Sequence, residues 1–276
     1  MNKPLRRQFD TVDSTTDPAD FVRYLDTTRA TDFFQKIKQR TFELMDLHPG
    51  ESVADLGCGT GEDVWDLAAR VSPGGSAIGV DVSATMIARA SERHRDAGSK
   101  VEFIQARFIQ ADVQRLPFED ARFDALRAER LLQHTPDAVA AVREMVRVAK
   151  SGARIVIWEG DLDLFIIDAP DYATSRKMQR FICDSFHHGD IGHRLFGLFR
   201  DCGLVDVQAI PLVGRFTNFP LIESAFNLSA SVEQAIQQNV IQKEAGMRWL
   251  ESLRSAHQAG RFFSAIGGFI TFGRKR

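Results

Sequence analysis

The sequence predicts an α/β fold in which helices cover both faces of a mostly parallel, seven-stranded sheet. Between residues 52 and 158, short apolar runs alternate with amphipathic segments, which is the pattern of consecutive β-α units. The first apolar run ends in a glycine-spaced turn that leads into a helical pattern. Together these two observations indicate an open sheet whose ligand lies beyond the carboxyl ends of the strands.

Two helical patterns precede the first strand. Apolar residues recur at helical spacing from Phe21 onward and again from Phe33 onward, before the chain turns at His48-Pro49-Gly50. We therefore expect an N-terminal helical cap over residues 1–47 and a catalytic domain over residues 48–276.

The first predicted strand runs from Ser52 to Leu56. Gly57, Gly59 and Gly61 follow it, and because they have no Cβ the backbone can turn tightly and approach a ligand closely. The next pattern is helical from Asp63 to Val71, so the turn ends at free backbone N–H groups that suit an anionic ligand group.

The spacing of these glycines does not match a dinucleotide site. The fingerprint G-x-G-x-x-G/A requires a small residue where Glu62 stands, which argues against an NAD-dependent reductase. The second predicted strand, residues 77–82, contains an acid near its end, Asp81, whose carboxylate can accept hydrogen bonds from both hydroxyls of a ribose. Ser83 is the expected N-cap of the helix that follows over residues 84–93.

The order acid-x-Gly-x-Gly-x-Gly resembles the first motif of the class I S-adenosylmethionine-dependent methyltransferases, of the small-molecule, UbiE-like type. Later segments resemble that family in order over about residues 42–160, namely residues 77–83, 110–118, 123–137 and 142–154. The resemblance implies a Rossmann-like sheet and S-adenosyl-L-methionine as the cofactor.

The resemblance also implies which residues hold the cofactor. The methionine part would lie against the glycine turn and the end of the fourth strand, the ribose against the acid of the second strand, and the adenine against residues that follow the second and third strands. These positions are Asp55, Gly57, Cys58, Gly59, Gly61, Asp81, Val82, Met86, Ala111, Asp112, Val113, Ala128 and Glu129.

A tandem repeat departs from the family pattern. Phe103-Ile104-Gln105-Ala106-Arg107 is followed at once by Phe108-Ile109-Gln110-Ala111-Asp112, where a usual member carries one copy. The distance to Leu116-Pro117-Phe118 favours Asp112 as the adenine contact. We expect the first copy to form the third strand and the second copy to lengthen the loop, and the effect of the repeat on the adenine pocket stays open.

The alternation of strands and helices changes after a fifth predicted strand over residues 154–158. A helix over residues 191–202 leads to a sixth strand over residues 205–210, and the last strand, over residues 261–273, lacks polar alternation, as expected of a strand inside the sheet. Helical insertions follow the fifth and sixth strands, over about residues 159–190 and 217–260. Since ligands bind beyond the carboxyl ends of the strands, we expect these insertions to roof the site and select the acceptor.

Two side chains are candidates for acid–base catalysis. His134 follows the fourth strand, where acceptor and methyl group should meet, and its reference pKa of about 6.5 suits proton abstraction. It could instead bind the acceptor, cap the turn before Pro136 or line the methionine end of the cofactor. Glu159 follows the fifth strand and could act as a base, and Asp161 could bind an acceptor amine; both could also be solvated loop carboxylates.

Further candidates for acceptor binding lie in the cap and in the first insertion. Tyr24 could close over the site or belong to the buried face of its helix, and Trp158 could face the acceptor or the core. His187 and His188 could form a polar wall. Adjacent histidines point in different directions, so we expect no metal site there.

Composition excludes several classes of protein. A net charge of -2 gives no excess of positive charge for binding nucleic acid. The sequence contains no run of eighteen apolar residues, so we expect no membrane-spanning segment. Three cysteines at irregular spacing favour neither a disulfide framework nor a zinc site, and the amino-terminal segment lacks the apolar stretch of a signal peptide. We expect a cytoplasmic protein, either a monomer or a homodimer.

The predicted function is methyl transfer to oxygen, nitrogen or carbon of a small organic acceptor, in secondary metabolism. The chain has 21 Phe and 2 Tyr, which favours an apolar or aromatic acceptor. A protein methyltransferase is an alternative, although Glu129-Arg130-Leu131-Leu132 stands where such enzymes often carry an Asn-Pro-Pro-Tyr-like motif. A fold that binds the cofactor without transferring methyl, cyclase-like or non-catalytic, is the other alternative.

Overall fold

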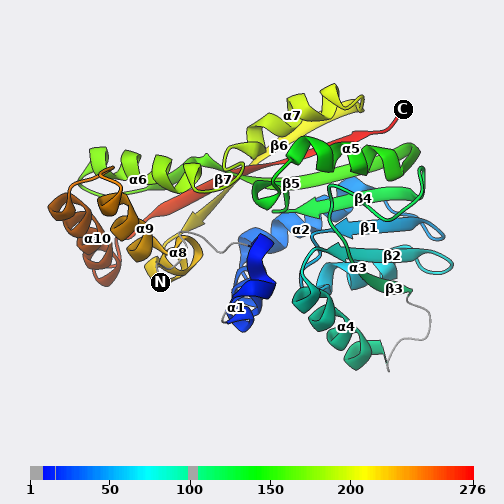
Figure 1. The fold of residues 1–276 in the computed structure, drawn as a ribbon, viewed down its shortest axis with the longest axis horizontal. Helices are drawn as coiled ribbons and strands as arrows, with labels where there is room; N and C mark the ends of the chain where they lie inside the picture. The colour runs from blue at the N-terminus through cyan, green and yellow to red at the C-terminus, as the bar shows by residue number, and fades with distance from the viewer. Residues whose placement is uncertain (1–8, 16, 99–104) are drawn as a thin grey trace.

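One mixed sheet organises the chain (Figure 1). The computed structural model describes residues 9–15, 17–98 and 105–276, and within them seven strands pair in the order β3-β2-β1-β4-β5-β7-β6. The first five strands in the chain pair in parallel, whereas β7 lies antiparallel between β5 and β6. The strands are β1 (Ser52–Leu56), β2 (Ser76–Asp81), β3 (Ala106–Gln110), β4 (Phe123–Glu129), β5 (Ala149–Ile167), β6 (Val205–Phe216) and β7 (Ser264–Arg274). The predicted fold class is confirmed.

Helices cover both faces of this sheet. One face packs against α5 (Ala138–Val148) and α7 (Ile191–Asp201), and the other packs against α2 (Asp32–Met45) and α3 (Glu62–Arg70). The helix α4 (Ala84–Gly98) lies beside β2 and β3. In the described part of the chain, no helix is both long enough and apolar enough to cross a lipid bilayer.

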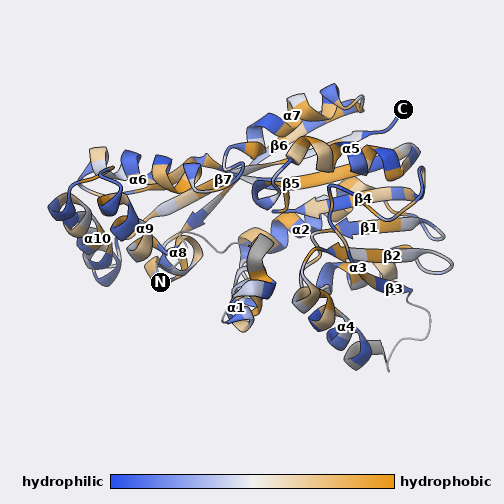
Figure 2. Ribbon diagram, in the orientation of Figure 1, coloured by the Kyte–Doolittle hydropathy of each residue, from blue (hydrophilic) through white to orange (hydrophobic). Residues whose placement is uncertain are grey.

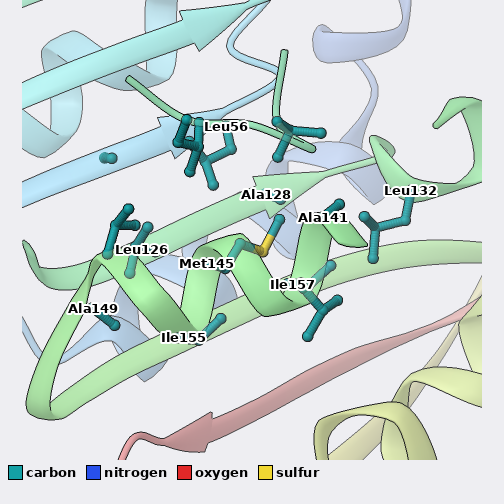
Figure 3. Close-up of a cluster of buried hydrophobic side chains, with 14 of the residues drawn as sticks. Leu56, Leu126, Ala128, Leu132, Ala141, Met145, Ala149, Ile155 and Ile157 are labelled. Atoms are coloured by element: carbon teal, nitrogen blue, oxygen red, sulfur yellow. The ribbon is translucent and has the colours of Figure 1, made fainter. Parts of the chain in front are cut away.

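The strands are apolar where they cross the centre of the sheet (Figure 2). On the α5 face, side chains of β1, β4 and β5 interlock with those of the helix (Figure 3). The labelled members of this cluster are Leu56, Leu126, Ala128, Leu132, Ala141, Met145, Ala149, Ile155 and Ile157. They are at most 1% exposed, and full burial of a large aliphatic side chain stabilises a fold by about 1.5–3 kcal/mol. This core fixes the strand ends that carry the site.

A second core lies beyond the central sheet. There β5 and β7 continue as a long antiparallel pair, and Phe165 and Ile167 pack against four helices (Figure 1). These helices are α6 (Tyr172–Asp184), α8 (Phe219–Phe226), α9 (Leu228–Gln237) and α10 (Lys243–Gln258). The fifth strand is therefore much longer than the predicted residues 154–158, because its second half pairs with β7.

The single helical stretch expected in the second insertion is divided into three helices. Asn227 and Asn239, with φ of 47° and 57°, adopt the left-handed conformation at the breaks. Asparagine tolerates this conformation better than most residues, so the breaks follow from local sequence.

The expected role of the tandem repeat is wrong. The strand β3 spans both copies: Ala106 and Arg107 end the first copy, and the next three residues, Phe108 to Gln110, begin the second. Within it, Ile109 pairs with Val80 and Gln110 pairs with Asp81. Of the first copy, residues 103 and 104 lie outside the described residues. The register of β3 against β2 decides where Asp112 lies. Because β3 ends at Gln110, which pairs with Asp81, Asp112 follows two residues later at the same edge of the sheet as Asp81.

The cap begins with a 3₁₀ turn, η1 (Phe9–Ser14), followed by α1 (Pro18–Arg29) and α2. Asp13 attaches η1 to α4, since its carboxylate accepts hydrogen bonds from the Ser83 hydroxyl (2.6 Å) and the Ala84 N–H (2.8 Å). These hydrogen bonds outweigh burial and lower the pKa of Asp13 to about 2. Ser83 caps α4 as predicted, because its Oγ accepts from the N–H of Met86 at 3.2 Å.

Candidate functional site

A pocket of about 430 Å³ opens at the carboxyl ends of β1, β2, β3 and β4. The glycine turn forms its floor. Gly57, Gly59 and Gly61 have φ of 73°, 53° and 83°, a conformation that side chains with a Cβ rarely adopt. A Cβ on Gly61 would lie 2.5 Å from the ring of Phe108, so this position also brings the turn close to β3.

Most of the residues expected to hold the cofactor line this pocket. They come from four separate strand ends: Asp55, Gly57, Cys58 and Gly59 after or within β1, Asp81 and Val82 after β2, Ala111, Asp112 and Val113 after β3, and Glu129 at the end of β4.

Asp81 lies at the centre of this arrangement. One carboxylate oxygen accepts from the N–H of Gly59 and the other from the N–H of Ser83, both at 2.9 Å. Each oxygen keeps lone-pair capacity for a ligand hydroxyl. Burial raises the pKa of Asp81 above its usual value, although the backbone hydrogen bonds oppose this shift. The carboxylate therefore faces the pocket with acceptor capacity left for the hydroxyl groups of a ligand.

Three of the expected cofactor residues do not line the pocket. Gly61 packs beneath the turn, against Phe108. Met86 is 1% exposed and belongs to a cluster with Val12 and Phe21 of the cap, and Ala128 is 0% exposed in the core under β4. The expected adenine contact of Met86 and the expected methionine contact of Ala128 are corrected, because both side chains point into packed interior.

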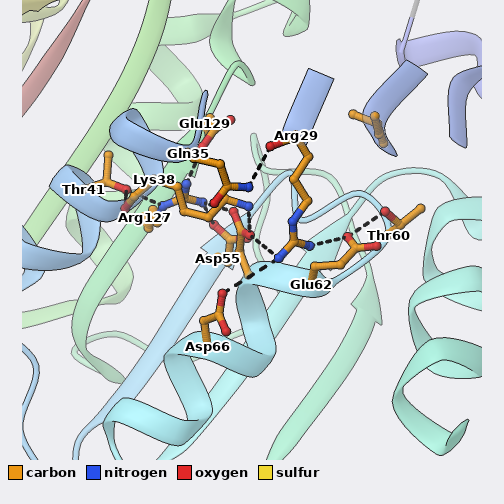
Figure 4. A network of polar contacts seen from close by, with 12 residues as sticks. Arg29, Gln35, Lys38, Thr41, Asp55, Thr60, Glu62, Asp66, Arg127 and Glu129 are labelled. Carbon is orange, nitrogen blue, oxygen red and sulfur yellow. Dashed lines mark hydrogen bonds and ion pairs between the residues drawn. The ribbon is translucent and has the colours of Figure 1, made fainter. Parts of the chain in front are cut away.

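A buried charge network forms one end of the pocket (Figure 4). Arg127 of β4 is 1% exposed and donates to Thr41 through Nε (2.9 Å) and to Asp55 through one terminal nitrogen (3.0 Å). Its guanidinium also pairs with Asp63 at 3.1 Å and with Glu129. Arg127 was not among the predicted site residues, since it lies inside a predicted strand and no local pattern marks it as part of a site.

The pKa values of two carboxyl groups in this network move in opposite directions. Burial raises the pKa of Asp55, and the charge of Arg127 only partly offsets it. Burial would also raise the pKa of Asp63, but the charges of Arg127 and Lys38 outweigh it and hold the pKa below its usual value. Lys38 pairs with Asp63, and Arg29 lies 3.4 Å from Glu62.

These residues fit S-adenosyl-L-methionine. Carboxylates and the cations Arg29 and Lys38 line the same end of the pocket, which suits a zwitterionic amino acid. Val82 lines the other end with its apolar side chain 48% exposed, which leaves a surface for a planar base. The volume also falls within the usual range of about 300–1,000 Å³ for ligand pockets.

A second, mainly apolar pocket of about 80 Å³ adjoins the first. It lies between the cap, the long strands and α8, so both the cap and the second insertion contribute to it. Its apolar lining includes Phe9, Phe34, Trp158, Leu162, Phe186, Phe216, Leu221, Ile222, Phe226 and Ile266. Phe9, Tyr24, Phe34, Arg130, Gln133 and His134 line both pockets. These six residues, which we call the junction, are where two ligands would meet.

The junction contains two of the predicted acceptor residues, Tyr24 and His134. The His134 ring lies 5.3 Å from that of Phe9 and 5.6 Å from that of Phe186, and its Nε2 lies 3.1 Å from Nε2 of Gln133. His134 belongs to a short 3₁₀ turn, η2 (Leu132–His134), directly after β4.

Trp158 also lines the apolar pocket. The remaining three predicted acceptor residues, Asp161, His187 and His188, do not line it. Asp161 is 0% exposed and accepts from the backbone N–H (2.7 Å) of His193, whose ring Nδ1 lies 2.6 Å away. His188 lies with Nε2 3.3 Å from the carbonyl of Pro136, outside both pockets, and His187 is exposed and also outside them. The expected acceptor contacts of Asp161, His187 and His188 are therefore corrected.

Glu159 does not have the surroundings of a catalytic base. It is 0% exposed, and its Oε1 accepts from the N–H groups of Leu131 (2.7 Å) and Leu132 (2.6 Å). Burial raises its pKa to about 8 despite these hydrogen bonds. The expected catalytic role of Glu159 is corrected: the side chain holds the turn that positions His134.

Several residues of the junction were missed. Phe9 precedes the predicted helices, and Phe34 was expected only to pack on a helix face. Arg130 was noted only for its place at the end of the fourth strand. Arg130 has φ of 54°, an unusual value for an arginine, which turns the chain from β4 into η2. No local signal distinguished these residues from ordinary core or surface positions.

The chain is similar to several known proteins. Residues 47–199 match a family model described as a methyltransferase domain. A 37.1 kDa protein from transposon Tn4556 of Streptomyces fradiae is 35% identical over 253 residues, which cover 91% of this chain and 70% of that protein. The demethylmenaquinone methyltransferase of Lactococcus lactis is 34% identical over 186 residues, 62% of this chain and 72% of the relative. Among solved structures, the YcgJ protein of Bacillus subtilis matches with a TM-score of 0.62 and 21% identity, over 87% of this chain and 98% of that one.

Proposed function

The chain belongs to the class I S-adenosylmethionine-dependent methyltransferases, and from this premise we propose that it methylates a small apolar or aromatic molecule. Its cofactor is S-adenosyl-L-methionine. The observation that carries the proposal is the junction, at which a polar pocket of cofactor size meets an apolar pocket. The naming of the Lactococcus relative as a demethylmenaquinone methyltransferase supports an aromatic acceptor of the quinol type.

The chain's residues would divide the work of holding the cofactor. Asp81 would accept hydrogen bonds from the ribose, and Val82 and Asp112 would lie at the adenine. The buried network around Arg127, together with Arg29, would bind the amino acid end. When bound, the cofactor supplies a methyl group on a sulfonium sulfur, which keeps the bonding electron pair after transfer.

The acceptor side requires orientation and, for a hydroxyl or an acidic carbon, removal of a proton. Orientation alone can supply about 7–11 kcal/mol of the barrier reduction. The aromatic walls of the apolar pocket would hold a flat acceptor with its reactive atom at the junction. His134 lines both pockets and is the titratable imidazole best placed to take the acceptor's proton. Glu159 would keep the turn that carries His134 in place.

The test begins with calorimetric titration of the purified full chain with S-adenosyl-L-methionine and S-adenosylhomocysteine. Both should bind at one site. Incubation with the methyl donor and a panel of naphthols, quinols and matched alkyl alcohols should then give methylated products of aromatic members only, as measured by mass spectrometry. No binding of either cofactor form would overturn the proposal. Binding with methylation confined to a protein or aliphatic acceptor would overturn the acceptor class.

A further inference from the structure

We propose that Arg130 binds an anionic oxygen of an aromatic acceptor, such as a phenolate or an aryl carboxylate, and so determines which acceptors enter the apolar pocket. The inference rests on the proposed function, because it assumes that this pocket takes the acceptor. It adds a charge requirement that the apolar walls alone do not predict.

The position of Arg130 gives it access to both ligands. It follows the last residue of β4, and its backbone N–H donates to the carbonyl of Trp158 at 2.9 Å. This hydrogen bond fixes the residue where β4 ends beside the middle of β5. The side chain, 18% exposed, lines the cofactor pocket and the apolar pocket.

Arg130 supplies a permanent positive charge to a mainly apolar pocket. Among the described residues that line that pocket, no carboxylate occurs, and His134 is the other side chain that can carry positive charge. An arginine stays charged at any ordinary pH. Taking a charge out of water is costly unless a partner compensates for it, so the pocket favours a ligand of opposite charge.

The existing partners of Arg130 leave it incompletely paired. A terminal nitrogen of Arg130 lies 3.5 Å from Oε1 of Glu129, beyond the usual 2.7–3.2 Å of a hydrogen bond. The other carboxylate oxygen of Glu129 accepts a hydrogen bond from Arg127. The Arg130 guanidinium lies 4.4 Å from the ring centre of Phe34. Its Nε is buried and has no hydrogen-bond partner among the described residues.

A second buried donor belongs to another residue that lines the same pocket. Nε1 of Trp158 is buried and likewise lacks a partner in the described part of the chain. Buried donors are nearly always satisfied in folded proteins, because a buried donor without a partner destabilises the fold. Small movements of either side chain on binding would let a ligand oxygen accept from it. A hydrocarbon acceptor would leave both donors unpaired, whereas an oxyanion would pair with at least one.

Aromatic chemistry follows from the neighbours of Arg130. Phe34 stacks on the guanidinium, and the rings of Phe9 and Phe186 both contact the ring of His134. Flat rings pack well against such walls, and an aryl oxygen lies in the plane of its ring, where a guanidinium can reach it.

The experiment compares two probes of nearly equal shape, 1-hydroxy-2-naphthoate and 1-hydroxy-2-naphthamide, titrated into the full chain saturated with S-adenosylhomocysteine. Wild type should bind the carboxylate roughly 10-fold or more tightly than the amide, as expected for a charge-assisted hydrogen bond. Arg130→Gln should lose that preference, and Arg130→Lys should keep part of it. Arg122→Gln, an exposed arginine outside both pockets, is the matched control and should behave as wild type.

The outcomes separate the inference from the function on which it rests. If wild type fails to bind S-adenosylhomocysteine, the proposed function falls. If wild type binds it but does not prefer the carboxylate, or if a folded Arg130→Gln keeps the preference, the role of Arg130 is refuted. The preference of wild type is measured without any variant, so a poorly folding substitution does not protect the inference.

Discussion

Replacing Asp81 by asparagine tests the assignment of the ribose site. In the structure each carboxylate oxygen accepts one backbone N–H, from Gly59 or from Ser83, and has one lone pair left for a ribose hydroxyl. Asparagine has the same shape but only one accepting oxygen. The variant would therefore lose one ribose hydrogen bond and leave one of the two backbone N–H groups without its acceptor.

The expected loss of affinity follows from these contacts. A hydrogen bond to a charged group contributes about 1.5–3 kcal/mol, so Asp81→Asn should weaken binding of S-adenosylhomocysteine by roughly 10- to 150-fold. The variant also loses a backbone hydrogen bond to Gly59 or Ser83. This loss should lower the free energy of unfolding of the ligand-free protein by about 1–3 kcal/mol. Calorimetry measures the affinity, and urea unfolding without ligand measures the stability.

Asp120→Asn is the matched control, because its side chain is 78% exposed and lies outside the pocket. It should leave the affinity unchanged. If Asp81→Asn bound S-adenosylhomocysteine within about threefold of wild type, the ribose would not lie at Asp81 and the orientation of the cofactor given above would be wrong.

Three further predictions concern stability. Gly61→Ala and Gly203→Ala both place a Cβ at φ +83°, which costs about 1–2 kcal/mol of stability in each variant. Only at Gly61 does the added Cβ also meet Phe108. Urea unfolding should therefore show Gly61→Ala to be less stable than Gly203→Ala by about 1–3 kcal/mol. Equal losses would contradict the steric explanation. Arg127→Met leaves buried carboxylates without their cation and should cost about 3–5 kcal/mol, and a loss below about 1 kcal/mol would show that the network contributes little to stability. Burial raises the pKa of Glu159 from 4.5 to about 8. Between these two pH values the folded protein holds a proton that the unfolded chain releases, so the contribution of Glu159 to stability is lost as the pH rises from one value to the other. The difference in unfolding free energy between wild type and Glu159→Gln should therefore change between about pH 5 and pH 8.5, and a constant difference would refute the shift.

Much of the central sheet could be predicted because its signals are local. The strand from Ser52 to Leu56 and the helix that follows it agree closely with the prediction, since apolar periodicity and glycine spacing reside within a few neighbouring residues. The place of Asp81 in the pocket lining could be predicted because parallel strands end at one edge of the sheet, whatever the rest of the chain does.

The register of the third strand could not be decided in this way. Each copy of the repeat has the same strand-forming pattern, so local propensity does not distinguish between them. The strand β3 takes the end of the first copy and the start of the second. Pairing of Ile109 with Val80 sets this register, and that pairing joins residues far apart in the chain.

The fold class, the glycine turn and the acids at the strand ends follow from local sequence, because each depends on spacing within one β-α unit. The junction and the surroundings of its charges arise only when distant segments pack together. Arg127 bonds to Asp55, 72 positions away, and to Thr41, 86 positions away. Glu159 is buried because β7 and the turn after β4 enclose it. Burial and charge pairing depend on segments that folding brings together, and no local pattern encodes them.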